Sequence, residues 1–473
     1  MVLNKEIEER IDRWVDEHVE EYLVDLAKLV AVPSVANPGV APGEFPFGEK
    51  SAEVLKTAKA LAESYGFTVE NRDNFCLVTK VGDGKEKMGI FGHLDVVPVG
   101  TDWSYPPFTM TREGDLVIGR GVMDDKGPLW ASVFAVRCLK ELDLLPSRAI
   151  EIFMGGDEEC GMEDVKHYKE TSETLPVVSF TPDADYPICH GEKGIMRFML
   201  DIPNENSGVV SFIGGTVRNV VADHAELTLS GVCPKALSEK LAGKPGIEVT
   251  SDGDNAKIIA TGKAVHASRP DNGTNAIALA ANAALDSGLL GEEAKKVLSF
   301  ISLVLSDCHG KAIGVPLCDE PSGALTHVGG VIKTAENKLI LSIDIRYPVT
   351  CDGDDVIRAI TDVVTPYGVT VSDFTDSKPL YIPVDSELVK TCMDTIDSVF
   401  HRPDWKPYTM GGGTYARNLP NAYALGPEDP AFMPFGPFRG GVHQDDEIAP
   451  ISTFVKTMKL YARLLLRVDD LTF

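Results

Sequence analysis

The alternation of apolar strand patterns with helical patterns over residues 51–154 constrains the fold of this chain most strongly. Helical patterns cover 51–65, where Ser51 is the expected N-cap, and 129–142. A β-rich run covers 67–81, and apolar strand patterns cover 87–97 and 149–154. Strands that alternate with helices predict βαβ units and an α/β fold with a mostly parallel sheet flanked by helices. In such sheets ligands collect at the carboxyl ends of the strands, so the polar residues that follow the strands are informative.

The pattern changes at about residue 195. Strand patterns at 196–202, 225–230, 256–260 and 338–345, with helical patterns at 274–285 and 354–364, predict a separate α+β domain. Helical patterns return at 386–400 and 452–466. We therefore expect one domain made of residues 1–194 and 384–473, with an α+β domain of residues 195–383 inserted into it.

Composition and charge limit the classes of partner. The chain has 473 residues, of which 44% are hydrophobic and 25% charged, the balance of a soluble globular protein. It carries 45 Lys and Arg against 71 Asp and Glu, a formal net charge of −26. Nucleic acids and anionic membranes attract basic surfaces, so neither is expected as the main partner. A site that binds cations through carboxylates is compatible with this charge.

The sequence also predicts a cytoplasmic setting. No stretch approaches the ~18 apolar residues that a transmembrane helix needs. The acidic, helical N-terminus lacks the basic and apolar regions of a secretory signal. Nine cysteines are scattered without a CxxC pair, which is typical of a reduced compartment.

Five short segments rich in histidine and carboxylates predict a metal site. The first four follow predicted strands or precede a predicted helix, and the fifth could fold back beside them. Each alone has an ordinary interpretation, such as a helix cap, an acidic turn or an Asx turn. Together they offer two histidines and several carboxylates, a ligand set suited to zinc or manganese. The segments are GHLD at 92–95, GRGVMDDKGP at 119–128, GGDEECG at 155–161, TPDAD at 181–185 and GGVHQDDE at 440–447.

Six motifs resemble those of the M20 metallopeptidases. GHLDVVP, GRGVMDDKGP, GGDEECGM, TPDADYP, KAVHASRP and VHQDDE occur in the order and spacing of that family. The chain is most similar to its PepV-type dipeptidases, which include the Xaa-His dipeptidase and carnosinase-like enzymes. The resemblance extends over roughly residues 10–470. It implies a catalytic domain formed by 1–194 and 384–473, and a lid domain at 195–383.

The resemblance implies a site for two divalent metal ions, with zinc favoured and manganese possible. Asp124 matches the carboxylate that bridges the two ions. One ion would take His93 and Asp183 as further ligands, and the other Glu159 and His443. The family also implies a cis peptide bond between the two acids of the DDKG motif.

Further roles follow from the same resemblance. Glu158 matches the general base, Asp95 the carboxylate that orients His93, and His266 a lid residue that stabilises the oxyanion. Residues 93 and 95 would share a face of a strand, which agrees with a partnership between His93 and Asp95.

Four residues match substrate-contacting positions of the family: Asn219, Arg346, Gly412 and Gly413. Arg346 would hold the C-terminal carboxylate of the substrate. The glycine-rich stretch at 410–417 lacks the Lys-Ser/Thr ending of a phosphate-binding loop, so a P-loop is rejected. The glycines would instead allow a close approach of the backbone. Asp185 could replace Asp183 as a ligand or contact the amine of the substrate.

The expected function is therefore hydrolysis of unmodified dipeptides by water that two metal ions activate. An N-acyl-amino-acid deacylase or amidase would use the same reacting groups and is the alternative within the family. A metal-binding scaffold without catalysis is the alternative outside the enzymes, but the presence of Glu158 argues against it. The expected partner is a small dipeptide, with no nucleic acid and no membrane. PepV-type dipeptidases have an enlarged lid that covers the site within one monomer, and the segment at 195–383 is long enough for such a lid, so the resemblance favours a monomer.

Overall fold

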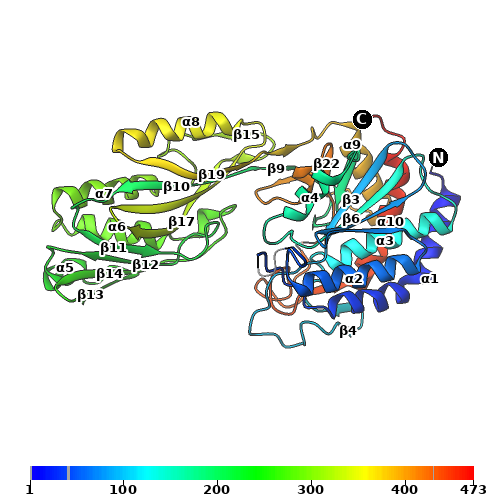
Figure 1. Ribbon diagram of the computed structural model, residues 1–473, viewed down its shortest axis with the longest axis horizontal. Coiled ribbons are helices and arrows are strands. Elements are labelled where there is room, and N and C mark those ends of the chain that lie inside the picture. Colours follow the sequence, from blue (N-terminus) through cyan, green and yellow to red (C-terminus); the bar gives the residue numbers. More distant parts are fainter. Residues whose placement is uncertain (1–2, 40–42, 430) are drawn as a thin grey trace. The chain divides into compact units, whose positions relative to one another are not determined.

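The computed structural model describes residues 3–39, 43–429 and 431–473, and the chain divides into two compact units (Figure 1). Unit 1 comprises Met1–His190, Ile382–Tyr408 and Thr414–Phe473. Unit 2 comprises Gly191–Tyr381 and Thr409–Gly413. The expected division assigned the short segment Thr409–Gly413 to the first domain, whereas in the structure it belongs to unit 2. Catalytic and lid roles for the two units remain predictions.

Unit 1 contains a sheet whose strands lie in the order β1-β2-β6-β3-β7-β22-β9. Its centre is parallel, because β3 pairs in parallel with β6 and β7, and β22 pairs in parallel with β7. Both edges are antiparallel. The strands are β1 (Val69–Arg72), β2 (Cys76–Val81), β3 (Lys87–His93), β6 (Ala149–Gly155), β7 (Val178–Thr181), β9 (Cys189–Glu192) and β22 (Ala422–Ala424).

Helices pack on both faces of this sheet (Figure 1). On one face α3 packs against β3, and α1 and α10 pack against α3. On the other face Tyr168 of α4 contacts the rings of Phe91 and Phe153, which belong to β3 and β6. The α/β class is therefore confirmed. The helices of unit 1 are α1 (Lys5–Val30), α2 (Glu49–Ser64), α3 (Lys126–Glu141), α4 (Glu163–Thr171), α9 (Glu387–Phe400) and α10 (Ile451–Val468).

The expected cap of the second helix is wrong. Helix α2 begins at Glu49, and its N-cap is Gly48 rather than Ser51. Ser51 is buried, and its hydroxyl donates a hydrogen bond to the carbonyl oxygen of Gly156 at 3.0 Å. A tertiary contact therefore takes the hydroxyl that local sequence rules assign to a cap.

Unit 2 contains an antiparallel sheet in the order β13-β14-β12-β11-β17-β18-β10-β19. Helix α6 packs on β12 and β14, α5 on β13 and β14, and α8 on β19. Its strands are β10 (Gly194–Pro203), β11 (Val209–Gly214), β12 (His224–Leu229), β13 (Ile247–Asp252), β14 (Asn255–Thr261), β17 (Thr326–Ala335), β18 (Lys338–Tyr347) and β19 (Thr370–Ser377). Its helices are α5 (Pro234–Leu241), α6 (Ala276–Asp286), α7 (Glu292–Val304) and α8 (Gly353–Val364).

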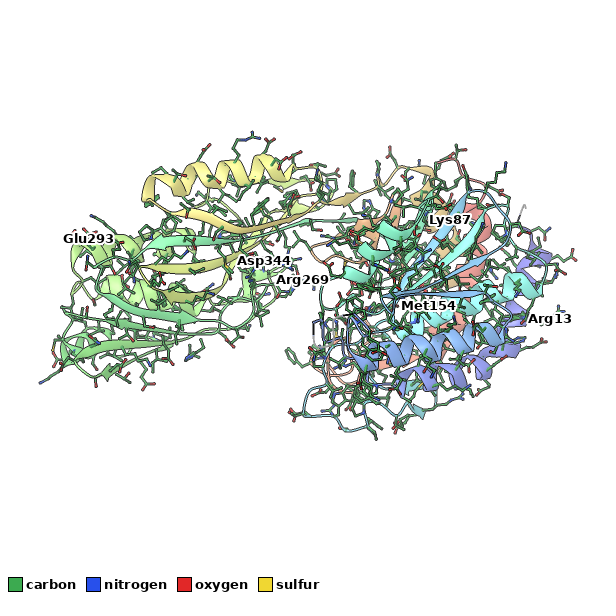
Figure 2. All side chains as sticks on the ribbon, in the orientation of Figure 1. Arg13, Lys87, Met154, Arg269, Glu293 and Asp344 are labelled. Carbon is green, nitrogen blue, oxygen red and sulfur yellow. The ribbon has the colours of Figure 1, made fainter. Side chains whose placement is uncertain are left out.

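Each unit has its own hydrophobic core. The side chains of both units are drawn in Figure 2, which labels Met154 on β6 of unit 1 and Asp344 on β18 of unit 2. All nine cysteines lie in the described part of the chain, and none of them forms a disulfide bond there. Among the described helices, none is both long enough and apolar enough to cross a bilayer.

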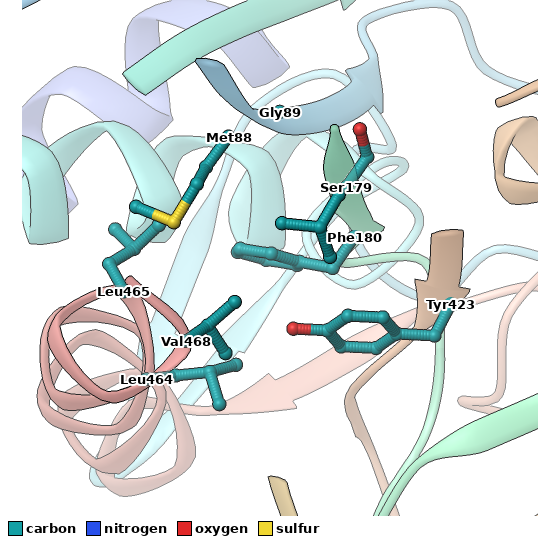
Figure 3. Close-up of a pocket in the computed structure, with 9 residues that line it drawn as sticks. Met88, Gly89, Ser179, Phe180, Tyr423, Leu464, Leu465 and Val468 are labelled. Carbon is teal, nitrogen blue, oxygen red and sulfur yellow. The ribbon is translucent and has the colours of Figure 1, made fainter. Parts of the chain in front are cut away.

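A small apolar pocket in unit 1 is part of this core packing. It lies between α10 and the sheet, and Figure 3 shows Leu464 and Val468 near Tyr423, with Leu465 beside Met88. None of the predicted metal ligands lines it. Apart from the phenol of Tyr423, its lining lacks titratable groups, so we assign it no role in chemistry.

Candidate metal centre

The predicted ligands of unit 1 meet at one edge of its sheet. His93 is the last residue of β3 and pairs in register with Gly155, the last residue of β6. Glu158 and Glu159 follow β6, and Asp183 follows β7, which is also parallel to β3. The carboxyl ends of parallel strands lie at the same edge, so these side chains converge there.

Two residues come to this edge from outside the strands. Asp124 precedes α3, and the peptide bond between Asp124 and Asp125 is cis. His443 lies in the loop before β24 (Ile448–Pro450), with a positive φ of 62°. The fifth sequence segment therefore does fold back beside the first four.

Asp124 lies between the two histidines. Its Oδ1 is 3.1 Å from Nε2 of His93, and its Oδ2 is 2.9 Å from Nε2 of His443. Each of its oxygens thus faces a different imidazole. This is the geometry of a carboxylate that can bridge two cations.

Each histidine also has a second carboxylate nearby. Oδ2 of Asp183 is 3.8 Å from Nε2 of His93, and Oε1 of Glu159 is 3.1 Å from Nε2 of His443. The side chains therefore form two groups that share Asp124: His93 with Asp183, and His443 with Glu159. Each group could supply three ligand atoms to one ion.

The protonation of His93 fits a cation at this position. Its Nδ1 lies 3.0 Å from the carbonyl oxygen of Asp95, and because a carbonyl only accepts, Nδ1 is the donor. Nε2 is therefore the nitrogen that faces Asp124 and Asp183, and the one that a cation can take as its ligand. This buried Nε2 has no hydrogen-bond partner among the described residues. A divalent cation between the nitrogen and the carboxylates would satisfy it.

The carboxylates of the site repel one another. Burial, and then the charge of Asp124, raises the pKa of Asp183 to about 7. Burial and the charge of Asp124 also raise the pKa of Glu159, although His443 opposes this shift. Such a cluster needs a proton or a cation to offset its charge.

Asp95 supports both His93 and the loop after β6. Its Oδ1 is 3.4 Å from Nδ1 of His93, so the main-chain carbonyl is the closer partner of that nitrogen. The same carboxylate accepts hydrogen bonds from the backbone N–H groups of Glu158 at 3.2 Å and Glu159 at 3.1 Å. Asp95 therefore fixes the turn that carries these two glutamates.

Glu158 lies beside the first group of ligands. One carboxylate oxygen of Glu158, a ring nitrogen of His93 and an oxygen of Asp183 lie within 4.8 Å of one another. Burial, and then the charge of Asp183, raises the pKa of Glu158 well above its usual value. A carboxyl group with a raised pKa at this distance can exchange a proton with a water molecule between the ligands.

Sequence reasoning missed Glu447, which holds the loop around Asp124. Its Oε1 accepts hydrogen bonds from the N–H groups of Met123 at 2.9 Å and of Asp124 at 3.1 Å. Both of its carboxylate oxygens also lie 3.1 Å from the N–H of Gly121. Its Oε2 accepts from Nη1 of Arg120 at 2.8 Å in a buried ion pair. The available signal was the run of three acids that ends four residues after His443.

Asp164 is a second support that the sequence did not reveal. It accepts hydrogen bonds from the N–H groups of Gly156 at 2.8 Å and Asp157 at 3.0 Å, and from the hydroxyl of Tyr415. These contacts hold the start of the turn after β6. Asp164 lies in the first turn of α4, where an acid is ordinary, so no local signal distinguished it.

Asp185 follows Asp183 on the short strand β8 (Ala184–Asp185). This strand pairs in parallel with β23 (Pro427–Glu428), so Asp185 lies opposite Glu428. Of the two aspartates, it is Asp183 whose carboxylate lies within 4.8 Å of both His93 and Glu158. Asp183 as the ligand, with Asp185 left for the substrate, is consistent with this placement.

The remaining predicted residues lie in unit 2. Nδ2 of Asn219 is 3.3 Å from Nε2 of His266, whose Nδ1 is 2.8 Å from the hydroxyl of Ser268. Val220 and His266 form an isolated β-bridge that places the Asn219 and His266 segments side by side. The structure therefore brings Asn219 and His266 together on an exposed part of unit 2.

Arg346 is buried and already holds internal partners. Its guanidinium donates to both carboxylate oxygens of Asp344, at 2.7 and 3.3 Å, and to the carbonyl of Gly411 at 3.0 Å. A Cβ on Gly411 would lie 2.7 Å from Cβ of Ser268, whereas one on Gly412 would lie 3.9 Å from its nearest neighbour. A side chain at Gly411 would therefore collide with Ser268, whereas the role of Gly412 and Gly413 toward the substrate stays a prediction.

The sequence matches the model of a known protein family. Residues 89–467 match the model of peptidase family M20/M25/M40. The chain belongs to this family. A Bacillus subtilis relative named "Putative dipeptidase YtjP" is 32% identical to this M20 chain over 462 residues, which are 94% of this chain and 96% of that protein.

Solved M20-type structures share the fold. The di-peptidase Dug1p from Saccharomyces cerevisiae matches with a TM-score of 0.58 at 14% identity, over 98% of this chain and 99% of that one. Human carnosine dipeptidase 1 matches with a TM-score of 0.54 at 18% identity, over 98% and 100%. As a member of this family, the protein is a hydrolase of the metallopeptidase class.

Proposed function

We propose that this M20 peptidase hydrolyses unmodified dipeptides with two divalent metal ions, zinc or manganese, bound in unit 1. The position of Asp124 carries the proposal, because its two oxygens face His93 and His443 separately. The proposed ligands are His93, Asp124 and Asp183 for one ion, and Asp124, Glu159 and His443 for the other. The names of the relatives as dipeptidases support the choice of substrate.

Bound there, the ions would supply an activated water molecule and polarise the scissile carbonyl. Glu158 takes the proton of that water and delivers it to the leaving amine. The carboxylate of Asp95 keeps Glu158 in place by accepting a hydrogen bond from its backbone N–H. The main-chain carbonyl of Asp95 fixes the ring of His93.

We propose that unit 2 acts as a lid that recognises both ends of the substrate. His266 stabilises the oxyanion, and Asn219, which lies beside His266, contacts the substrate. Arg346 binds the substrate carboxylate, with Asp344 holding its guanidinium in a fixed plane. Gly412 and Gly413 line the substrate pocket. We also propose that the enzyme is a cytoplasmic monomer.

A substrate panel tests the proposal directly. Amine release is measured from several dipeptides, one tripeptide and one N-acetyl amino acid, with added zinc or manganese and again with a chelator. We expect cleavage of dipeptides only, abolished by the chelator. Cleavage of the N-acetyl compound with dipeptides untouched would assign the chain to the deacylases and overturn the substrate proposal.

The role of Glu158 needs a separate variant. Glu158→Ala is expected to abolish turnover, while the affinity for zinc stays close to that of the wild type, because Glu158 is not a proposed ligand. Glu173→Ala, an exposed glutamate of the same unit, is the control and should keep full activity. A Glu158→Ala variant that retained most of its rate would contradict the assignment of the base.

A further inference from the structure

Unit 2 contains a cluster of metal-ligating side chains outside the centre described above. Asp271, Cys308 and His309 offer ligand atoms that all lie within 4.8 Å of one another. Nε2 of His309 is 2.7 Å from Oδ1 of Asp271, and Sγ of Cys308 is 3.9 Å from the same oxygen. In these three residues, here called the Asp271 cluster, Cys308 and His309 are consecutive, and the fold brings the distant Asp271 to them.

The imidazole of His309 is oriented as metal-binding histidines usually are. Its Nδ1 lies 2.9 Å from the carbonyl oxygen of Leu325, which can only accept, so Nδ1 carries a proton. The other nitrogen, Nε2, is directed at Asp271. A backbone carbonyl that fixes the tautomer in this way leaves Nε2 available as a ligand.

Without a cation, a second proton must occupy Nε2 to make the contact with Asp271. That hydrogen bond is the main reason why the pKa of His309 is raised. A metal ion would replace this proton and the thiol proton of Cys308, and both would be released to solvent. A cation could therefore replace the proton between His309 and Asp271 without rearrangement of the imidazole ring.

The surroundings favour a positive ion. The carboxylate of Asp307 accepts hydrogen bonds from the N–H groups of His309 at 2.8 Å, Lys311 at 3.1 Å and Ala312 at 2.8 Å, so its negative charge is fixed beside the cluster. The side chains of His309 and Asp271 are 42% and 64% exposed, which gives an ion and a water ligand access. A ligand set of nitrogen, sulfur and oxygen suits zinc better than magnesium, calcium or manganese.

We propose that Asp271, Cys308 and His309 form a further metal site of the zinc type, with water completing the coordination. It is distinct from the centre of unit 1, whose proposed ligands include no thiol. The proposal does not depend on which substrate the enzyme cleaves.

The position of the site suggests what the ion would do. Asp271 lies on the short helix η1 (Pro270–Asn272), which follows the His266 segment. The start of β17 already holds both sides: the hydroxyl of Thr326 donates to the carbonyl of Ala267 at 2.9 Å, and the N–H of His327 donates to the carbonyl of Cys308 at 2.9 Å. A metal ion at the Asp271 cluster would add a cross-link between the same two segments. If His266 acts as proposed above, the ion would restrain the segment that carries it.

Cobalt titration of the full chain tests the site through a readout that hydrolysis does not affect. Thiolate ligands give Co²⁺ an intense near-ultraviolet charge-transfer band, whereas the histidines and carboxylates of unit 1 do not. We expect a band that saturates as Co²⁺ is added and that Zn²⁺ abolishes by displacement. Cys308→Ser should remove the band, and Cys160→Ser, which changes the exposed thiol beside Glu159, should leave it intact.

Two further variants keep the thiol and test the other ligands. Asp271→Asn and His309→Gln should each weaken the affinity for Co²⁺ by about tenfold or more. Circular dichroism checks that each variant is folded. A wild-type chain without the band, or a band that survives in Cys308→Ser, would mean that the cluster is an ion pair only and would overturn the proposal. Because the band is measured without substrate, failure of the dipeptidase proposal would leave this result unaffected.

Discussion

At the scale of single residues, the carboxylate of Glu447 controls the loop that presents Asp124. It accepts backbone hydrogen bonds from Gly121, Met123 and Asp124 and pairs with Arg120, all in a buried environment. These donors engage both of its carboxylate oxygens. Its contribution to the metal centre is therefore one of positioning.

Replacing Glu447 by Gln should weaken metal binding. The amide places N–H groups against backbone donors and leaves the buried Arg120 without its counter-charge. We expect the affinity for zinc to fall by about 10–100-fold, measured by competition with a chelating dye. Glu173→Gln, an exposed change in the same unit, is the control. Equal zinc affinities of Glu447→Gln and Glu173→Gln would show that Glu447 does not position the metal centre.

Asp164 should make stability depend on pH. Burial, and then the charge of Asp95, raises the pKa of Asp164 to about 6. The folded chain therefore binds this proton more tightly than the unfolded chain, whose Asp titrates near pH 4. The resulting stabilisation is fully present below about pH 4 and is lost as the pH rises through about 6.

Asp164→Asn isolates this contribution from those of the other acids. Urea unfolding of both proteins is measured across this pH range. The free energy of unfolding of the wild type, relative to the variant, should fall by on the order of 2 kcal/mol between about pH 4 and pH 7. A difference that stays constant with pH would show that Asp164 does not titrate in this way.

At the scale of elements, the start of α3 is tied to the end of α1. Nζ of Lys126 donates to the carbonyls of Leu29 at 3.0 Å and Val32 at 2.8 Å, and the side chain is fully buried. Burial lowers the pKa of Lys126 to about 7. This contact anchors the helix directly after the loop that carries Asp124.

Lys126→Met should destabilise unit 1 because two buried carbonyls lose their donor. We expect a loss of about 2 kcal/mol in the free energy of unfolding, measured in urea. Lys140→Met is the matched control on the same helix, where Nζ donates to the carbonyls of Tyr65 and Gly66 at a more exposed position. Its cost should be smaller, since water can replace the lost donor there. Equal losses would contradict the role given to burial.

At the scale of the whole molecule, the proposed ligands of the two-ion centre all belong to unit 1. Binding to the folded state stabilises only the parts of the chain that the ligand orders. Manganese prefers oxygen and nitrogen ligands and is a poor partner for the thiol of the Asp271 cluster.

Hydrogen exchange with and without Mn²⁺ should therefore separate the units. We expect slower exchange in peptides from the end of β3, the loop before α3 and the turn after β6. Peptides from β10 to β19 of unit 2 should be unchanged. Protection of both units to the same degree, in the absence of substrate, would show that the ion couples them.

The sequence predicted the α/β class, the peptidase family and the convergence of His93, Asp124 and Asp183 at one sheet edge. The class and the convergence could be predicted because apolar strands followed by polar residues form a local pattern and parallel strands end at a common edge, whereas the family came from the resemblance of six motifs. Sequence reasoning misplaced the cap of α2 at Ser51, whose hydroxyl bonds to the distant Gly156. It also missed Glu447, whose role depends on a buried loop more than 300 positions away.

By itself, the sequence determined which side chains could bind ions and which strands could carry them. Only the tertiary structure decided how they are used. Asp124 faces both His93 and His443 because the loop of Glu447 folds onto the start of α3. Asp271 meets Cys308 and His309 because β17 holds both of their segments. Spacing along a chain defines contacts within one strand or helix, whereas contacts between distant loops depend on how the buried elements pack.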